Sequence, residues 1–248
     1  VSPSMFVGRL NELKKLESTL VQTGAGLPVN FMLTGERGIG KTSFLNYIKW
    51  VADGSIPLDD QKFNFLVIET DIDQNTTQVG LVKKIELGLK RALGKTEKAR
   101  TFFKNAWDFI QKIEAAGYGL KDNVVHDETF LEEFSYSLAD TVNRVTELTT
   151  NEFDLSAKYQ GVLLLIDEAD KCAKELDLGT FVKLLLERLQ RQKCQKFMIG
   201  LAGLPDLRNV LNDSHPSSLR IFEQVPLERL SDPDINQVID IGLEKAKE

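Results

Sequence analysis

The chain has 248 residues and a formal net charge of −6, with 42% hydrophobic and 27% charged residues. These values are ordinary for a globular protein and allow one large α/β domain or two small ones. They argue against several classes of segment and of binding site. No apolar run is long enough for a membrane-spanning helix or a secretory signal, two cysteines are too few for a zinc site, and the acidic balance gives no electrostatic footprint for nucleic acid.

The first elements are an amphipathic helix and a buried strand. Leucines 10, 13, 16 and 20 recur with a helical period, and glycines and a proline at positions 24–28 end that helix. Residues 29–34 form a short and mostly apolar stretch, which predicts a buried strand. We therefore expect an N-terminal arm over residues 1–28, followed by the first strand of a sheet.

A glycine-rich loop follows that strand and fits the phosphate-binding pattern G-x-x-x-x-G-K-[ST] without exception. Its residues are Gly35, Glu36, Arg37, Gly38, Ile39, Gly40, Lys41 and Thr42, with Ser43 next in the chain. Residues 43–51 have the apolar spacing of a helix face, so the loop opens a helix whose N-terminus favours anions. Lys41 supplies a charge for the β- and γ-phosphates and Thr42 a hydroxyl for Mg²⁺.

The middle of the chain predicts a second strand and three helices. Residues 63–69 are mostly apolar and predict a strand, and apolar periods predict helices over residues 82–93, 99–113 and 130–145. The aromatic stripe that includes Trp107 could serve base stacking or a partner surface, but packing in the core is the better interpretation. A loop is expected around residues 117–123, where glycines and polar residues gather.

A second buried strand, residues 161–166, ends in two acids. Asp167 at the carboxyl end of a parallel strand lies where ligands bind in open α/β sheets, and it would hold Mg²⁺. Glu168 would polarise a water for attack on the γ-phosphate. The phosphate loop upstream makes this interpretation much stronger than the acids alone would.

The remaining elements complete an alternation of strands and helices. A helix is expected over residues 181–192, strands over 197–201 and 221–225, and a last helix after the capping pattern at Ser231 and Asp234. This order predicts an α/β protein with a mostly parallel five-stranded sheet covered on both faces.

Three stretches together resemble an AAA+ ATPase: residues 6–13, the phosphate loop, and residues 165–170. Within that superfamily the chain most resembles the branch near origin-recognition, transposition-accessory and STAND-type signalling ATPases. The resemblance implies a three-layer P-loop NTPase sandwich with the phosphate-loop strand at its centre. It also implies a nucleotide-binding core over residues 1–230 and the start of a helical lid over 231–248, so we expect a fragment of a longer protein.

The resemblance also implies further site residues. Val7 and Gly8 would line the adenine pocket with Arg9 beside it, although a structural salt bridge explains Arg9 almost as well. Arg220, just before the fifth strand, matches an arginine that reaches the nucleotide of a neighbouring subunit; a surface ion pair is the alternative. ATP or ADP with Mg²⁺ would be the ligands, and catalysis would fall to Lys41, Glu168 and Arg220.

Several functions stay open at this stage. The first is a cytoplasmic ATPase that couples slow hydrolysis to self-association or to remodelling of a protein partner. The second is a STAND-like nucleotide switch with little turnover, because residues 199–204 offer no polar side chain where the family usually orients the attacking water. The third is a DNA-associated initiator or transposition ATPase, with DNA contacted only by domains outside this chain. A GTPase is disfavoured because the guanine-specific pattern Asn-Lys-x-Asp is absent.

Overall fold

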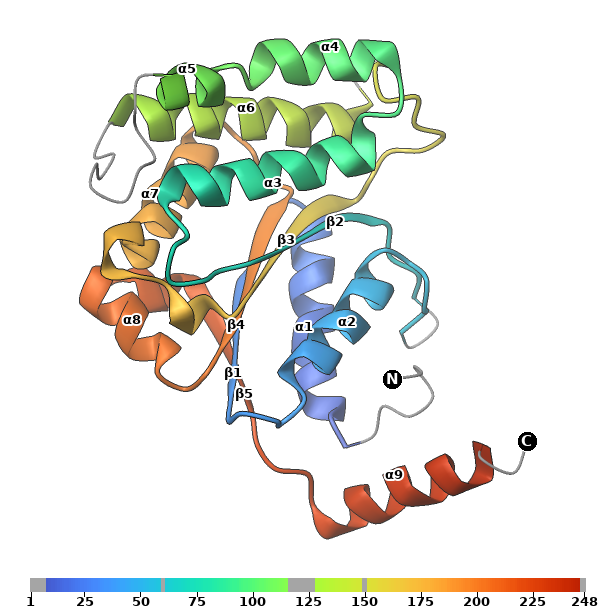
Figure 1. Cartoon of the computed structure of the whole chain (residues 1–248). Coiled ribbons are helices and arrows are strands. Elements are labelled where there is room, and N and C mark those ends of the chain that lie inside the picture. Colours follow the sequence, from blue (N-terminus) through green and yellow to red (C-terminus); the bar gives the residue numbers. More distant parts are fainter. Residues whose placement is uncertain (1–7, 59–60, 116–127, 149–150, 246–248) are drawn as a thin grey trace.

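Five strands form one sheet in the computed structural model, which describes residues 8–58, 61–115, 128–148 and 151–245 (Figure 1). The strands are β1 (Asn30–Gly35), β2 (Phe65–Asp71), β3 (Gly161–Asp167), β4 (Phe197–Gly203) and β5 (Phe222–Leu227). Their order is β2-β3-β4-β1-β5, and every neighbouring pair runs parallel. The predicted α/β fold with a parallel five-stranded sheet is confirmed.

The expected place of the phosphate-loop strand was wrong. We predicted β1 at the centre of the sheet, whereas β4 holds the centre and β1 lies between β4 and the edge strand β5. The chain leaves β3, crosses through a helix and returns as β4 between β3 and β1. Hydrophobic runs mark all of these strands as buried, but they carry no information on which neighbour each strand takes.

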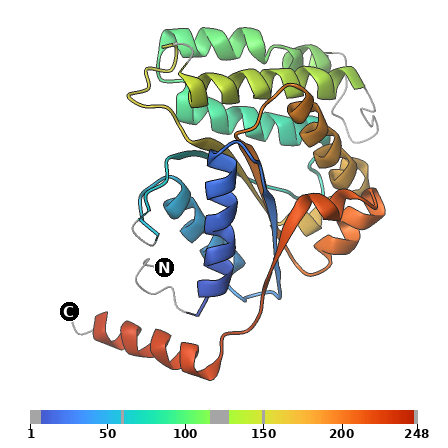
Figure 2. The same ribbon diagram turned by 180° about the vertical axis from the view of Figure 1, so that it is seen from behind.

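Helices cover both faces of the sheet, as the continuous apolar strands require. On one face α1 (Leu10–Gly24) and α2 (Lys41–Ala52) pack against alternate residues of the strands, such as Phe31, Leu33 and Leu165. On the other face lie α3 (Gln78–Leu93), α6 (Glu128–Glu147) and α7 (Leu178–Arg191). Three more helices pack on these: α4 (Glu97–Ala106) on α3, α5 (Phe109–Ala115) on α6, and α8 (Leu207–Ser214) on α7. Figure 2 shows α1 from behind, lying along the sheet.

Two helices differ from the sequence prediction. The helix expected over residues 99–113 is two helices, because α4 ends at Ala106 and α5 starts at Phe109. At the break, Ser137 of α6 donates a hydrogen bond to the carbonyl of Ala106, and Trp107 is only 1% exposed in an aromatic cluster. The core interpretation of Trp107 is thereby confirmed. Helix α8 was missed, although Leu207 and Leu211 have helical spacing and are buried.

The last helix, α9 (Asp232–Lys245), begins as predicted. The Ser231 backbone N–H donates to the Asp234 carboxylate (3.1 Å), and the Asp234 N–H lies 3.4 Å from the Ser231 hydroxyl, which is a capping box. In both views α9 projects from the end of β5, away from the layers around the sheet. Ile235, Ile239 and Leu243 of this helix are about half exposed.

Short 3-10 turns complete the described elements: η2 (Ala169–Lys171), η3 (Lys174–Leu176) and η4 (Ser218–Ile221). None of the helices in the described ranges combines the length and the apolar character needed to cross a membrane. The loop predicted around residues 117–123 lies outside the described residues.

Candidate functional site

The loop between β1 and α2 has the backbone geometry that phosphate binding needs. Gly38 and Gly40 have φ angles of +79° and +97°, a region that side-chain-bearing residues rarely adopt. No other heavy atom lies within 4 Å of the place where a Cβ would sit on either residue, so their φ angles rather than crowding favour glycine. Gly40 is the N-cap of α2 and offers no side chain to the first turn. The N–H groups of that turn are therefore directed toward the loop and can bind an anion.

The ammonium group of Lys41 spans the loop. Its Nζ donates to the carbonyl oxygens of Gly35 (2.7 Å) and Glu36 (3.0 Å). The side chain therefore folds back over the loop, next to the helix N-terminus, instead of extending into solvent. A cation held there adds a full charge to the partial charge of the helix dipole.

The sheet brings Thr42 and Asp167 together, although they lie far apart in the sequence. The hydroxyl of Thr42 donates to Asp167 Oδ2 at 3.0 Å, and the other oxygen, Oδ1, accepts from the Glu168 N–H at 2.8 Å. A hydroxyl beside a carboxylate is the oxygen-rich donor set that Mg²⁺ takes together with substrate phosphates. These two residues therefore fit the ion, which supplies charge neutralisation when it is bound.

These residues line one cavity of about 380 Å³ at the carboxyl edge of the sheet. The cavity has three positively charged side chains and three negatively charged ones. They are Arg37, Lys41 and Lys171, and Asp167, Glu168 and Asp170. Since the side-chain charges cancel in sum, their placement decides how a polyphosphate is bound. Lys41 beside the helix N-terminus, the backbone dipoles of the loop and a divalent cation would together meet the phosphate charge.

Gly8 and Arg9, two of the residues expected beside adenine, do not line this cavity. Arg9 is 6% exposed, and its guanidinium donates to the carbonyl of Glu228 (2.5 Å) and lies 3.4 Å from the Glu12 carboxylate. A Cβ on Gly8 would lie 2.6 Å from Asp234. Both residues therefore tie the N-terminal arm to the segment that leads into α9. Val7 lies outside the described residues, and nucleotide contact by these three residues stays a prediction.

Arg220 and the phosphate loop lie at opposite ends of two neighbouring parallel strands, β5 and β1. It is exposed on η4, directly before β5, whereas the loop follows the carboxyl end of β1. The two parallel strands pair from Asn30 with Phe222 to Gly35 with Leu227, which spans about 17 Å. Arg220 therefore cannot serve the cavity of its own chain, and an action on a neighbouring chain stays a prediction.

Four residues of the cavity were not among the predicted site residues: Asp170, Lys171, Gly203 and Leu204. Lys171 forms an ion pair with Glu168, with Nζ and Oε2 at 2.5 Å. Asp170 accepts a hydrogen bond from the Leu204 N–H at 2.8 Å, and a Cβ on Gly203 would lie 2.5 Å from the same carboxylate oxygen. The i,i+3 spacing of Glu168 and Lys171 was a visible signal, but only the turn after β3 shows that the two side chains meet.

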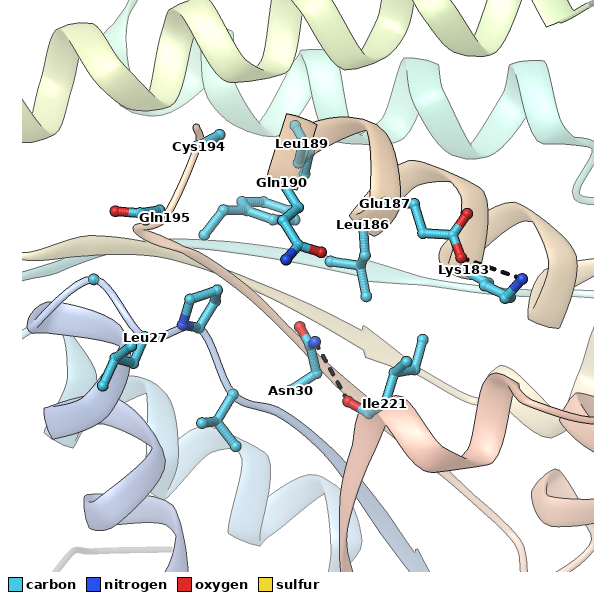
Figure 3. Close-up of a pocket in the computed structure, with 14 residues that line it drawn as sticks. Leu27, Asn30, Lys183, Leu186, Glu187, Leu189, Gln190, Cys194, Gln195 and Ile221 are labelled. Carbon is cyan, nitrogen blue, oxygen red and sulfur yellow. Dashed lines mark hydrogen bonds and ion pairs between the residues drawn. The ribbon is translucent and has the colours of Figure 1, made fainter. Parts of the chain in front are cut away.

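A second cavity, of about 470 Å³, lies at the amino edge of the sheet (Figure 3). Asn30 is labelled in its wall. The Asn30 carboxamide accepts from the Ile199 N–H (2.8 Å) and donates to the Ile221 carbonyl (3.4 Å), so it joins β1 to its neighbours on both sides. Lys183 and Glu187 pair with each other at 3.2 Å along one side. The remaining wall is mostly apolar, and it lacks the phosphate loop and the acidic strand end.

A parallel sheet with helices on both faces, a glycine loop opening α2, and a carboxylate beside the loop hydroxyl define a P-loop nucleotide-binding domain. Comparison with known families agrees with this class. The AAA ATPase domain family matches residues 5–199, and the chain belongs to that family. A comparison with curated proteins finds no match.

Solved structures share the fold at low sequence identity. Cdc6p from Pyrobaculum aerophilum has a TM-score of 0.53 and 20% identity, with 100% of this chain and 54% of that chain covered. The ORC2 protein of Aeropyrum pernix, solved as ADPNP-ADP complexes, has a TM-score of 0.51 and 15% identity, with 88% and 47% covered. The ORC1 protein of Aeropyrum pernix, solved in complex with DNA, has a TM-score of 0.50 and 15% identity, with 97% and 50% covered. This chain thus spans about half the length of these structures.

Proposed function

We propose that this domain binds ATP or ADP with Mg²⁺ in the phosphate-loop cavity and hydrolyses ATP slowly. The hydrogen bond of 3.0 Å between Thr42 and Asp167 is the observation that carries the proposal. It joins the hydroxyl that follows the phosphate loop to the carboxylate that ends β3, and Lys41 lies in the same cavity. The complexes of the ORC2 protein with ADPNP and ADP support the same ligand class, since the fold is shared.

Four residues of the cavity have a role in this proposal. Lys41 would bind the β- and γ-phosphates, and Thr42 and Asp167 would supply oxygen ligands to Mg²⁺, which would neutralise phosphate charge. Glu168 follows Asp167 in the chain and accepts the proton of a water that attacks the γ-phosphate. Hydrolysis then breaks the bond between the γ-phosphorus and the bridging oxygen, and it yields ADP and phosphate.

Slow turnover follows from what the chain lacks at the end of β4. Gly203 lines the cavity where a polar side chain could hold the attacking water, and a Cβ at this position would lie 2.5 Å from Asp170 Oδ1. We therefore expect a rate well below about 1 per second, the lower end of the usual range for enzymes. The same observation favours the second candidate, a nucleotide switch that holds ATP or ADP and rarely turns over.

Assembly or partner remodelling is the process that we propose hydrolysis drives. Arg220 supports self-association, because it is exposed and lies far from the cavity of its own chain. A guanidinium from a neighbour could stabilise the transferring phosphoryl group, an effect that reaches about 10³–10⁵ in rate in related P-loop enzymes. DNA association is a third candidate, supported by the ORC1 complex, but the net charge of −6 does not favour direct contact by this chain.

Calorimetric titration with ATP and Mg²⁺ tests the binding site. Lys41→Ala should weaken ATP binding about 10- to 150-fold, because a hydrogen bond to a charged group contributes about 1.5–3 kcal/mol. Lys49→Ala is the matched control, since Lys49 lies on the same helix and pairs with Glu69 instead. Equal affinity in the wild type and Lys41→Ala would refute the site.

Phosphate release tests the reaction itself. Glu168→Gln is nearly isosteric and should keep ATP binding while turnover falls about 10²-fold or more. Glu175→Gln on η3 is the control, because Glu175 lies outside the cavity. Wild-type turnover in Glu168→Gln would exclude Glu168 as the base.

A further inference from the structure

The turn that follows β3 is fixed to the sheet on both of its sides. Ala169 is fully buried, and the Asp170 carboxylate accepts the Leu204 N–H at 2.8 Å just beyond the end of β4. The Lys171 N–H in turn donates to the Glu168 carbonyl at 2.9 Å. These contacts hold the backbone of η2 in place. They therefore also fix the backbone positions from which the side chains of Glu168 and Lys171 extend.

Close packing against β4 holds this turn in place. A Cβ on Gly203 would lie 2.5 Å from Asp170 Oδ1 and 3.1 Å from the Asp170 backbone nitrogen. The first contact is shorter than a Cβ makes, so a side chain at position 203 would require Asp170 or β4 to shift. The position of η2 relative to the phosphate loop is thus set by the sheet.

Glu168 and Lys171 meet at the mouth of the cavity. Glu168 has φ 54° and ψ 30°, a left-handed conformation that is uncommon for a residue with a side chain. Its carboxylate lies 2.5 Å from the Lys171 ammonium, and both side chains are 49% exposed. Among the described residues, no other ion pair involves either side chain. The proposed base is therefore already engaged by a cation of the same turn.

We propose that Lys171 is a positioning residue that restrains Glu168 in a resting ion pair and so limits the rate of hydrolysis. This inference rests on the proposed ATPase activity. The ion pair holds the Glu168 carboxylate toward Lys171, so the carboxylate has to leave Lys171 before it can turn to a water in the cavity. Since the pair faces solvent, it is also weak, and the restraint is partial.

Turnover at saturating ATP and Mg²⁺ gives the first test. Lys171→Gln removes the charge, and we expect hydrolysis to rise about two- to fivefold, the range that an exposed ion pair can account for. ATP affinity, measured by calorimetry, should stay within about twofold, because Lys171 acts through Glu168. Lys171→Arg keeps the pair and should keep the slow rate, and Lys174→Gln on η3 should also leave it unchanged.

Salt dependence separates a restraint from a purely structural role. Raising NaCl from about 50 to 500 mM screens exposed charges, so the wild-type rate should approach that of Lys171→Gln. The Lys171→Gln rate should respond less. A slower Lys171→Gln enzyme, with or without a salt effect, would overturn the restraint and would point to direct contact of Lys171 with the phosphates.

The ion pair itself can be measured without turnover. In protein labelled with ¹³C-lysine, the Cε resonance that Lys171→Gln removes belongs to Lys171. Glu168→Gln should shift this resonance, whereas Glu175→Gln should not. Normal hydrolysis with no shift would overturn the restraint alone. A clear shift with no hydrolysis by any variant would overturn the proposed ATPase activity and the restraint with it.

Discussion

Gly203→Ala tests how closely β4 and the turn after β3 approach each other. The added Cβ would lie 2.5 Å from Asp170 Oδ1 and 3.1 Å from Leu207 Cδ2. Relief requires movement of Asp170 or of its backbone, which lies 3.1 Å away. Inserting a methyl group into a packed core costs typically about 1–3 kcal/mol of the free energy of unfolding. For a domain of this size the melting temperature should fall by about 2–12 °C.

Thermal unfolding followed by circular dichroism measures this cost. Gly24→Ala at the end of α1 is the matched control, because the nearest atoms to its new Cβ would be 3.8 Å away. Alanine also has the better helix propensity, so its melting temperature should stay level or rise.

A double-mutant cycle tests whether the contact with Asp170 causes the loss of stability in Gly203→Ala. Asp170→Ala removes the nearest atom, so Gly203→Ala should cost less in that background than in the wild type. An unchanged melting temperature for Gly203→Ala alone would refute the packing argument. An equal cost in both backgrounds would show that the contact with Asp170 is not its source.

Three further predictions concern the cation, the neighbouring chain and the thiols. Thr42→Ala should weaken ATP binding only when Mg²⁺ is present, and Thr42→Ser should restore it; titrations with and without EDTA measure this, and equal losses in both would contradict Mg²⁺ coordination. Arg220→Ala should keep ATP affinity but abolish any rise of specific activity with protein concentration, as measured by phosphate release beside light scattering; a rise that persists would exclude the trans role. Burial raises the pKa of Cys172 to about 11 and that of Cys194 to about 12. Because only the thiolate reacts, labelling by a disulfide reagent should be slow at neutral pH and rise about tenfold per pH unit toward these values; a rate that levels off near pH 9 would contradict the shifts.

Local patterns were enough to predict the elements around the proposed phosphate site. The glycines at positions 38 and 40 have positive φ angles, and the apolar runs on both sides form β1 and α2. The capping box at Ser231 also formed as predicted. These features depend on residues within a few positions of one another, so their physical cause is visible in the sequence.

Tertiary structure decided which of these elements meet. Strand order depends on crossovers between distant segments, so the sequence alone could not place β4 between β3 and β1 or Arg220 at the far edge. The same packing breaks the helix at Trp107, where burial of the indole outweighs a continuous helical period. Asp170 meets Gly203 and Leu204 because β4 lies next to β3 in the sheet. The sequence by itself identified the phosphate loop and the acidic strand end, whereas the place of the turn that follows the proposed base depends on contacts between residues that are distant in the chain.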